Sequence, residues 1–199
     1  RESPIVVRHL HIPIQSGSDT VLKRMRRKYT MDFFAGRLEK LRSALPDLAI
    51  TTDVIVGFPG ETEEEFMETY DFIQAHGFSE LHVFPYSQRT GTPAARMDGQ
   101  IDEEVKNECV HRLIALNGQL AKEYASKFEG ELLEIIPEER FKENPESGLL
   151  EGYTDNYLKV VMPGDDSLIG KLVKVKISKA GYPYNECQFV RVLDELAVT

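Results

Sequence analysis

Ionisable and polar side chains recur at alternate positions in three apolar stretches of the sequence, residues 9–15, 51–57 and 81–86. The polar positions are His9, His11, Gln15, Asp53, His82 and Tyr86. Alternate residues of a β-strand share a face and successive parallel strands pair, so these side chains are predicted to line one wall. A single histidine in such a place is usually structural. Their joint placement on one strand face is the informative feature, because in barrel folds the C-terminal rim of such a wall is the catalytic end.

A turn at Phe58-Pro59-Gly60 follows the second stretch, and an acidic helix follows the turn. Proline presets φ and glycine permits a positive φ, while Thr62 and Glu65 have the spacing of a capping box. Ligands of parallel α/β proteins bind where strands end in such turns. An ordinary loop between a strand and a helix has the same pattern, so this segment alone leaves both interpretations open.

Residues 23–28 read Lys-Arg-Met-Arg-Arg-Lys and form a concentrated basic segment. The whole chain has a formal net charge of −9, which argues against nonspecific nucleic-acid binding over the whole surface. Any contact with nucleic acid would have to be made by a local basic surface. A solvated helix end, favoured by the helix dipole, explains the basic segment equally well.

The three strand-like stretches alternate along the chain with segments that have helical periodicity, and this order predicts an α/β fold. Helices are expected over about 19–25, 30–45 and 63–75, and a longer amphipathic helix over about 102–128. Three β/α units would then form half of a parallel barrel. We therefore divide the chain into a half-barrel at 1–97, a linker helix at 98–128 and a small β domain at 129–199.

The last third of the sequence changes to short strands separated by turns, which is typical of a small OB-like barrel. Strands are expected at Glu131–Ile136, Leu149–Thr154, Tyr157–Met162, Lys171–Ser178 and Cys187–Leu193. Inward-pointing residues are predicted to be Leu158, Val160, Val173, Val175 and Ile177. Outward-pointing residues on neighbouring strands are predicted to be Tyr157, Lys159, Lys174 and Lys176. They would offer RNA an aromatic stacking platform beside positive charge, and a solubilising sheet surface is the alternative.

Composition and cysteine spacing argue against a membrane-spanning protein and against a disulfide-stabilised one. No apolar run is long enough to span a membrane, and the first residues carry no signal segment and no Met. We therefore expect a soluble, cytoplasmic protein and a chain that is a piece of a longer one. Cys109 and Cys187 have no CxxC neighbour, which argues against a disulfide framework and against a self-contained metal site.

Four segments together resemble a known enzyme family. They are His-Leu-His-Ile-Pro-Ile-Gln-Ser-Gly-Ser-Asp at 9–19, Arg-Met-Arg-Arg-Lys-Tyr-Thr at 24–30, Thr-Asp-Val-Ile-Val-Gly-Phe-Pro-Gly-Glu-Thr at 52–62, and Phe-Pro-Tyr-Ser at 84–87 with Arg-Thr-Gly-Thr at 89–92. In this order they are similar to the second half of a radical S-adenosylmethionine methylthiotransferase. The C-terminal barrel, with Glu-Gly-Tyr-Thr-Asp-Asn-Tyr-Leu-Lys at 151–159, resembles the TRAM domain that ends those enzymes.

This resemblance implies the C-terminal half of a radical SAM (β/α)6 partial barrel followed by a TRAM domain. The implied activity is transfer of a methylthio group to C2 of a hypermodified adenosine beside the tRNA anticodon. Segments 24–30 and 91–97 are most similar to the branch acting on N6-threonylcarbamoyladenosine, and the isopentenyl-adenosine branch is the next alternative. A ribosomal-protein methylthiotransferase and a non-catalytic RNA-binding module stay open as further alternatives.

The family uses S-adenosylmethionine and two four-iron four-sulfur (4Fe-4S) clusters held by cysteine sets that this chain lacks. Those cysteines are expected upstream of Arg1, so the chain alone is expected to be inactive and to contain no catalytic residue and no metal ligand. The implied partners are tRNA and an electron donor such as flavodoxin or ferredoxin, with no membrane.

The positions matching the family's S-adenosylmethionine cradle are Gln15, Ser16, Ser18, Arg27, Val56, Phe58, Pro59 and Tyr86. Arg27 is predicted to bind the methionyl carboxylate, because a guanidinium can donate two parallel hydrogen bonds to it. Phe58 and Pro59 are predicted to lie near the adenine, which favours an apolar slot. Tyr86 is the weaker candidate for the same pocket.

Overall fold

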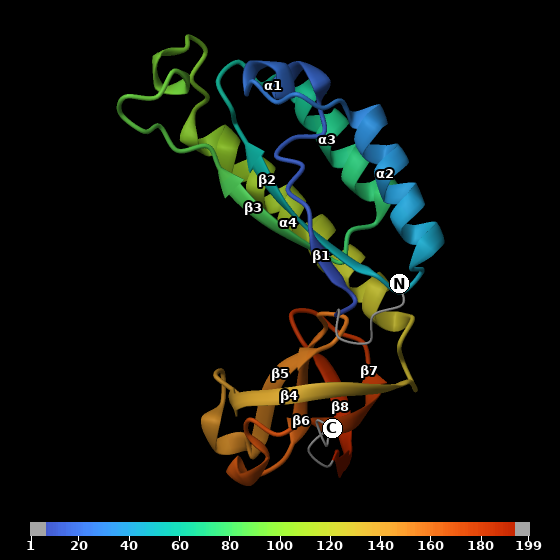
Figure 1. The fold of residues 1–199 in the computed structure, drawn as a ribbon. Coiled ribbons are helices and arrows are strands. Elements are labelled where there is room, and N and C mark those ends of the chain that lie inside the picture. The colour runs from blue at the N-terminus through green and yellow to red at the C-terminus, as the bar shows by residue number, and fades with distance from the viewer. Residues whose placement is uncertain (1–6, 194–199) are drawn as a thin grey trace. The chain divides into compact units, whose positions relative to one another are not determined.

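The computed structural model describes residues 7–193, which belong to two compact units (Figure 1). Within the described residues, the first unit comprises residues 10–120, and the second comprises residues 121–193 together with residues 7–9. The long helix α4 (Glu103–Ser126) contributes to both units, because the division falls after Leu120. The helix therefore contributes residues to both units, and its role as a linker over residues 98–128 stays a prediction.

The first unit contains a three-stranded sheet in the order β1 (His9–His11), β2 (Ala49–Val56) and β3 (Glu80–Pro85). Strands β2 and β3 are parallel, with Asp53 opposite His82. The β1 segment continues along β2 in the same direction, since Ile55 N donates to Gln15 O at 2.8 Å and Gln15 pairs in parallel with Val54. All three chain segments therefore leave the sheet at one edge.

Helices follow the strands as the sequence predicted: α1 (Asp19–Arg24), α2 (Met31–Ala44) and α3 (Glu63–His76). Thr30 caps α2 by accepting from Phe33 N. Thr62 and Glu65 form the predicted capping box of α3, and Gly77 ends it in the left-handed conformation at φ 55°. A single 3₁₀ turn, η1 (Ala94–Arg96), lies between β3 and α4.

One face of this sheet packs against helices, which lie together on one side of it in Figure 1. Its buried side chains include Ile14, Ile50, Val54 and Val56. The helices contribute a matching set of buried residues, Leu38, Phe66, Ile73, Leu113 and Leu116. Each such side chain contributes about 1.5–3 kcal/mol when fully buried, so the aliphatic alternation fixes which strand face turns inward. The polar positions are thereby directed to the other face.

The second unit is a closed barrel with the strand order β4-β5-β6-β8-β7. The strands are β4 (Leu132–Arg140), β5 (Leu149–Thr154), β6 (Lys159–Pro163), β7 (Val173–Lys179) and β8 (Asn185–Val192). Short 3₁₀ turns lie at η2 (Pro145–Ser147) and η3 (Asp166–Leu168). The predicted inward residues Leu158, Val160, Val173, Val175 and Ile177 are all buried, which confirms the interior of the barrel.

Strand neighbours in the barrel differ from chain order. Strand β6 pairs in parallel with β8 through Val160 and Val161, and β8 then pairs antiparallel with β7. The prediction that the strands carrying Lys159 and Lys174 are neighbours is therefore wrong, because β8 lies between them. No helix among residues 7–193 is both long and apolar enough to cross a membrane.

Candidate functional site

A cavity of about 280 Å³ lies at the edge of the first unit where the strands end. Its lining consists of Gln15, Arg24, Met25, Arg26, Arg27, Ile55, Phe58, Tyr86, Thr92, Pro93, Ala94 and Met97. We call it the strand-end cavity. These residues come from the end of β2, from the segments that follow β1 and β3, from the basic end of α1, and from the loop before α4. This is the edge at which parallel α/β proteins bind ligands.

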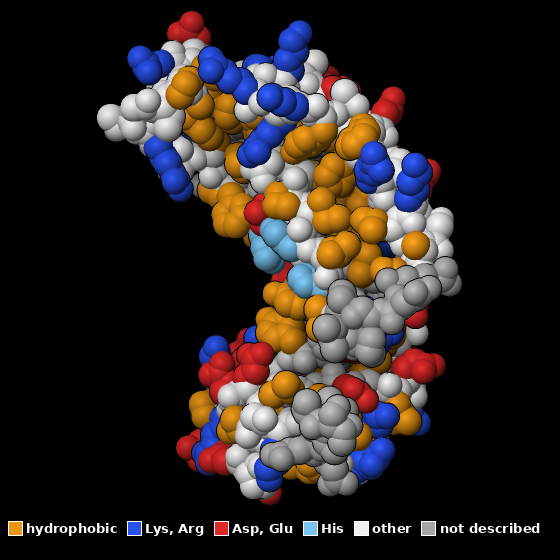
Figure 2. All heavy atoms as spheres, viewed as in Figure 1, with side chains coloured by type: hydrophobic (Ala, Val, Ile, Leu, Met, Phe, Trp, Pro, Cys, Tyr) orange, Lys and Arg blue, Asp and Glu red, His pale blue; other side chains and the backbone are white. Residues whose placement is uncertain are grey.

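A second cavity of about 470 Å³ adjoins the first. The two share Gln15, Ile55, Tyr86, Thr92 and Ala94, and the second also includes Asp53, Phe84, Pro85, Ser87 and Arg89. The combined hollow therefore extends from the basic end of α1 to the polar face of the sheet. Figure 2 shows Lys and Arg side chains around hydrophobic side chains at the end of this unit that carries α1.

Two arginines of the basic segment have different roles. Arg24 donates to both carboxylate oxygens of Glu65, at 2.9 and 2.5 Å, and this pair joins α1 to the first turn of α3. Arg27 is exposed and donates one hydrogen bond, at 3.2 Å, to the side-chain oxygen of Gln15. Arg24 is therefore committed to the fold, while Arg27 retains donors that an anionic ligand in the strand-end cavity could accept.

Gln15 has a backbone conformation that side-chain-bearing residues rarely adopt, with φ at 64°. Such a residue costs on the order of 1–3 kcal/mol and persists only where its surroundings fix it. Here the neighbouring strand does so, because Gln15 N donates to Asp53 O at 2.9 Å and Gln15 O accepts from Ile55 N at 2.8 Å. The turn places the Gln15 side chain in the lining of both cavities.

Tyr86 brings an unsatisfied hydroxyl to the cavities. Its oxygen is buried and has no hydrogen-bond partner among the described residues. Its ring lies edge-on to Phe58, with ring centroids 5.3 Å apart and planes at 72°. A buried polar atom without a partner costs about 1–3 kcal/mol, so this hydroxyl is a candidate contact for a bound ligand.

Ser16 and Ser18, which the sequence predicted as cofactor contacts, are fully buried beneath the site. Ser16 Oγ lies 3.2 Å from Thr69 Oγ1, and Ser18 Oγ lies 2.8 Å from Thr20 Oγ1. Gly17 between them packs so closely on α3 that a Cβ atom would lie 2.6 Å from Thr69 Cα. Both hydroxyls thus serve the packing of this turn, and direct contact with a cofactor stays a prediction.

Val56 and Pro59 are buried, and neither is among the residues that line the two cavities. The Val56 side chain packs in the core, and its carbonyl accepts a hydrogen bond from Tyr86 N at 2.8 Å. Of the eight predicted cofactor-binding residues, the structure places Gln15, Arg27, Phe58 and Tyr86 together at the strand-end cavity. The assignment of the other four stays a prediction.

Glu61 is a functional candidate that the sequence analysis missed, although it lies in the turn motif. Its carboxylate accepts hydrogen bonds from Gly57 N and from Phe58 N, the latter at 3.2 Å. Burial is the main cause that raises its pKa to about 7, and the two backbone hydrogen bonds only partly oppose this. Glu61 therefore changes charge near neutral pH at the turn that carries Phe58, whose backbone amide donates to its carboxylate.

Other lining residues were also missed. Ile55 shares the polar face of β2, and its apolar side chain gave no signal of a ligand contact. Residues 91–97 were noted only as part of a motif, yet Thr92, Pro93, Ala94 and Met97 line the strand-end cavity. Such contacts depend on how a loop folds back over a sheet, which the local sequence does not encode.

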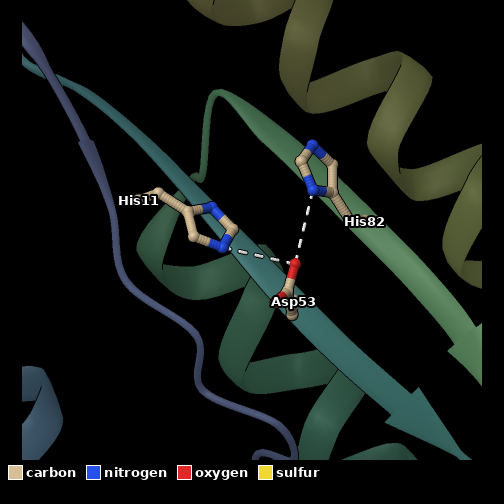
Figure 3. A group of neighbouring side chains, drawn as sticks. All are labelled: His11, Asp53 and His82. Carbon is tan, nitrogen blue, oxygen red and sulfur yellow. Dashed lines mark ion pairs between the residues drawn. The ribbon is translucent and has the colours of Figure 1, made fainter.

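The polar face of the sheet is confirmed for three of its predicted residues. His11, Asp53 and His82 come together from β1, β2 and β3, as Figure 3 shows. His11 Nε2 and His82 Nδ1 each lie 3.3 Å from Asp53 Oδ1. His9 instead belongs to the second unit, where its ring stacks on Tyr157 at a centroid distance of 3.9 Å. His9 lies two residues before His11 on β1, but its ring contact is with Tyr157, and its place in the shared wall stays a prediction.

The two cysteines do not form a metal site in this chain. Cys109 belongs to the first unit and Cys187 to the second, and both are buried. Burial raises the pKa of the Cys109 thiol to about 11 and that of Cys187 to about 12. Both thiols are protonated at neutral pH, whereas iron–sulfur clusters are held by thiolates. The donor set present does not fit a 4Fe-4S cluster.

The predicted RNA-binding residues of the barrel do not form one continuous platform. The Tyr157 ring stacks on His9 and also on Tyr153, with centroids 4.9 Å apart in the second pair. Lys159 Nζ lies 3.4 Å from the carboxylate of Glu151, which is buried. The ring of Tyr157 is thus engaged within the unit, and Lys159 balances a buried acid.

Lys174 and Lys176 both lie on β7 and are separated from Lys159 by β8. Lys174 Nζ lies 3.7 Å from Glu134, while Lys176 is exposed. Arg191 of β8 is opposite Lys174 in the ladder. The cations on this side of the barrel are therefore those of β7 and β8, and their contact with RNA stays a prediction.

Comparisons with known proteins agree with both units. Residues 1–73 match the model of the radical SAM superfamily, and residues 128–184 match that of the TRAM domain. The threonylcarbamoyladenosine tRNA methylthiotransferase MtaB of Bacillus subtilis (strain 168) is 75% identical over 190 residues, which are 96% of this chain and 42% of the relative.

A second group of relatives is less similar. A tRNA-2-methylthio-N(6)-dimethylallyladenosine synthase of Thermoanaerobacter sp. (strain X514) is 44% identical over 179 residues, or 90% of this chain and 38% of the relative. The corresponding synthase of Acetivibrio thermocellus is 43% identical over 178 residues, or 89% of this chain and 37% of the relative. The chain thus spans about two fifths of the length of the curated relatives it matches.

Proposed function

We propose that this chain, which belongs to the radical S-adenosylmethionine methylthiotransferase family, is part of an enzyme that adds a methylthio group to C2 of N6-threonylcarbamoyladenosine beside the tRNA anticodon. The observation that carries the choice of substrate is the difference in identity. The relative named for threonylcarbamoyladenosine is 75% identical, while those named for dimethylallyladenosine are 44% and 43% identical.

In this proposal the first unit is the C-terminal half of a radical SAM (β/α)6 partial barrel, and the strand-end cavity is its cofactor side. The parallel pairing of β2 and β3, and the helices packed on one face, support that assignment. The closed five-stranded barrel is the tRNA-binding TRAM domain. The complete protein would work in the cytoplasm and receive electrons from a donor such as flavodoxin or ferredoxin.

The residues of the strand-end cavity fit S-adenosylmethionine. Arg27 would hold the methionyl carboxylate, since its guanidinium is exposed and makes a single hydrogen bond to Gln15. Phe58 offers an apolar surface for the adenine, and the unpartnered Tyr86 hydroxyl would hydrogen-bond to the ligand. When bound, the cofactor and its cluster supply the radical chemistry. These side chains bind the cofactor, orient it and exclude water from it.

The two 4Fe-4S clusters need ligands from parts of the relatives that this chain does not match. After anaerobic reconstitution with iron and sulfide, the 199-residue chain is expected to show no stable cluster absorption and to release no 5′-deoxyadenosine from S-adenosylmethionine. The buried, protonated thiols of Cys109 and Cys187 are the reason. Turnover by the chain alone would contradict the assignment of cluster ligands.

The substrate is tested with the full-length protein in cells that lack their own tRNA methylthiotransferases. Nucleosides from digested tRNA are identified by mass spectrometry. We expect 2-methylthio-N6-threonylcarbamoyladenosine to appear and isopentenyl-adenosine to stay unmodified. Methylthiolation of isopentenyl-adenosine would assign the chain to the other tRNA branch. Modification of a ribosomal protein without modified tRNA, or tRNA binding without any modification, would overturn the proposal.

A further inference from the structure

We propose that His11, Asp53 and His82 bind a divalent transition-metal ion of the zinc class on the polar face of the three-stranded sheet. We call these residues the His-Asp-His cluster (Figure 3). One ligand atom from each residue lies within 4.8 Å of the other two. This inference is independent of the proposed function, because it rests only on the geometry of this sheet.

Strand pairing fixes the arrangement of the cluster. Asp53 and His82 are directly opposite in the parallel ladder of β2 and β3. His11 is placed on the other side of Asp53 by the hydrogen bond from Ile12 N to Thr51 O at 2.9 Å. Three ligands on three adjacent strands are held by backbone ladders, which makes a more precise site than one built on loops.

The distances fit a metal better than a simple ion pair. Both imidazole nitrogens face the same oxygen, Asp53 Oδ1, at 3.3 Å. A charge-assisted hydrogen bond closes to about 2.7–2.9 Å. Ligands about 2.0–2.1 Å from a tetrahedral zinc ion are separated by roughly 3.3–3.4 Å along each edge of the tetrahedron. The nitrogen-to-oxygen spacing in the cluster therefore matches the edge of such a coordination shell.

Ring orientation is fixed by a second contact. His11 Nδ1 lies 2.9 Å from Oγ1 of Thr51, whose residue is buried. With Nδ1 held by the hydroxyl, Nε2 is the nitrogen directed at Asp53, as Figure 3 shows. Metal-binding histidines generally have such a partner on the other ring nitrogen, which sets the tautomer and the ring angle.

Direct contact without a metal ion is the competing explanation for this geometry. The rings of His11 and His82 are stacked with their centroids 5.4 Å apart, and each presents a nitrogen to the same oxygen of Asp53. A metal ion accounts for this convergence, because both rings then coordinate as neutral bases. Two imidazoles and one carboxylate suit zinc, iron(II), manganese or cobalt, whereas calcium and magnesium prefer oxygen ligands.

The cluster also has room for a further ligand. The side chains of His11 and His82 are 37% and 40% exposed, and Figure 2 shows histidine side chains at the surface of this face. Three protein ligands leave at least one coordination position open, as in catalytic rather than structural zinc sites. Asp53 also lines the larger cavity, so that open position would face it.

The test uses the 199-residue chain after chelator treatment and dialysis, titrated with zinc chloride in a calorimeter and with cobalt chloride in an absorption spectrometer. We expect one ion per chain and visible cobalt bands without a sulfur-to-cobalt charge-transfer band. His82→Ala and Asp53→Asn should each weaken zinc binding at least about 100-fold. His111→Ala, on the exposed surface of α4, is the matched control and should bind like the parent.

Thr51→Val tests whether the Thr51 hydroxyl orients His11 for metal binding, because this substitution keeps the side-chain shape and removes only the hydroxyl. A loss of roughly 10-fold is expected, as for other partners of metal-binding histidines. Circular dichroism of every variant separates lost ligands from lost folding. Absence of zinc binding by the folded parent, binding that survives His82→Ala, or a thiolate band in the cobalt spectrum would overturn the proposal.

Discussion

The two units differ in how their cations are brought together. In the first unit, Arg24, Arg26 and Arg27 come from one short stretch of chain, and all three line the strand-end cavity. In the barrel, Lys159 and Lys174 lie on strands separated by β8, and each lies near a carboxylate, Glu151 or Glu134. Cations close in sequence at a helix end converge through local geometry. Cations on different strands converge only where the sheet order makes those strands neighbours.

Buried acids show the same contrast between the units. Glu61 in the first unit has backbone hydrogen bonds but no ion pair in the described structure, and burial raises its pKa to about 7. Glu151 in the barrel is also buried, but Lys159 Nζ lies 3.4 Å from its carboxylate. The first unit therefore keeps a titratable carboxyl group in the turn after β2, while the barrel places a lysine beside its buried carboxylate.

The largest expected effect is on the pH dependence of stability. The folded state binds the proton of Glu61 more tightly than the unfolded chain does, because the folded pKa lies above the ordinary value of 4.5. The stabilisation that this proton provides is fully present below about pH 4.5 and is lost as pH rises through about 7, by up to about 3 kcal/mol. Glu61→Gln should flatten this part of the profile in urea denaturation. Equal stabilities of parent and variant near pH 4 are the internal control, and an unchanged slope between pH 4.5 and 7 would contradict the assignment.

Arg27→Ala should have the next largest effect, on cofactor binding by the full-length protein. If the guanidinium donates two hydrogen bonds to a largely desolvated carboxylate, its loss should weaken S-adenosylmethionine binding by about 2 kcal/mol, roughly 30-fold. Calorimetry measures the affinity. Lys28→Ala is the matched control, since Lys28 is also exposed but does not line the cavity. Equal losses in both variants would indicate a general charge effect.

Lys159→Ala should act on stability rather than on RNA binding alone. It leaves the buried carboxylate of Glu151 without its nearby cation, which we expect to destabilise the barrel by about 1 kcal/mol. Thermal unfolding of the 199-residue chain measures this. The double variant Lys159→Ala with Glu151→Gln should recover part of the loss. A barrel as stable as the parent in the single variant would show that the pair contributes nothing.

Changing Lys159, Lys174 and Lys176 together to Glu should lower tRNA affinity and flatten its salt dependence. The strand order sharpens this expectation, because Lys174→Glu with Lys176→Glu should produce most of the change without altering the Glu151 pair. Two lost phosphate contacts would reduce the slope of log affinity against log salt by about 2. Filter binding of the full-length protein to tRNA at several salt concentrations is the measurement. An unaltered slope would identify this face as a solvated surface.

Much of the local structure was predictable from the sequence. The capping box at Thr62 and Glu65 and the buried alternation of Val173, Val175 and Ile177 appear as predicted. These features depend on residues a few positions apart, where backbone geometry and side-chain periodicity act directly. The motifs also predicted a family resemblance, and the matches of residues 1–73 to the radical SAM model and of residues 128–184 to the TRAM model agree with it.

Only the tertiary structure decided which of these side chains meet. The sequence placed His9 and His11 on one strand face, yet His9 stacks on Tyr157 in the second unit, while His11 joins Asp53 and His82. It placed Ser16 and Ser18 in the cofactor cradle, yet both are buried in the packing of Gly17 against Thr69. Alternation determines the face on which a side chain lies. The partner across that face depends on strand order, register and the path of distant loops, which are set by long-range packing.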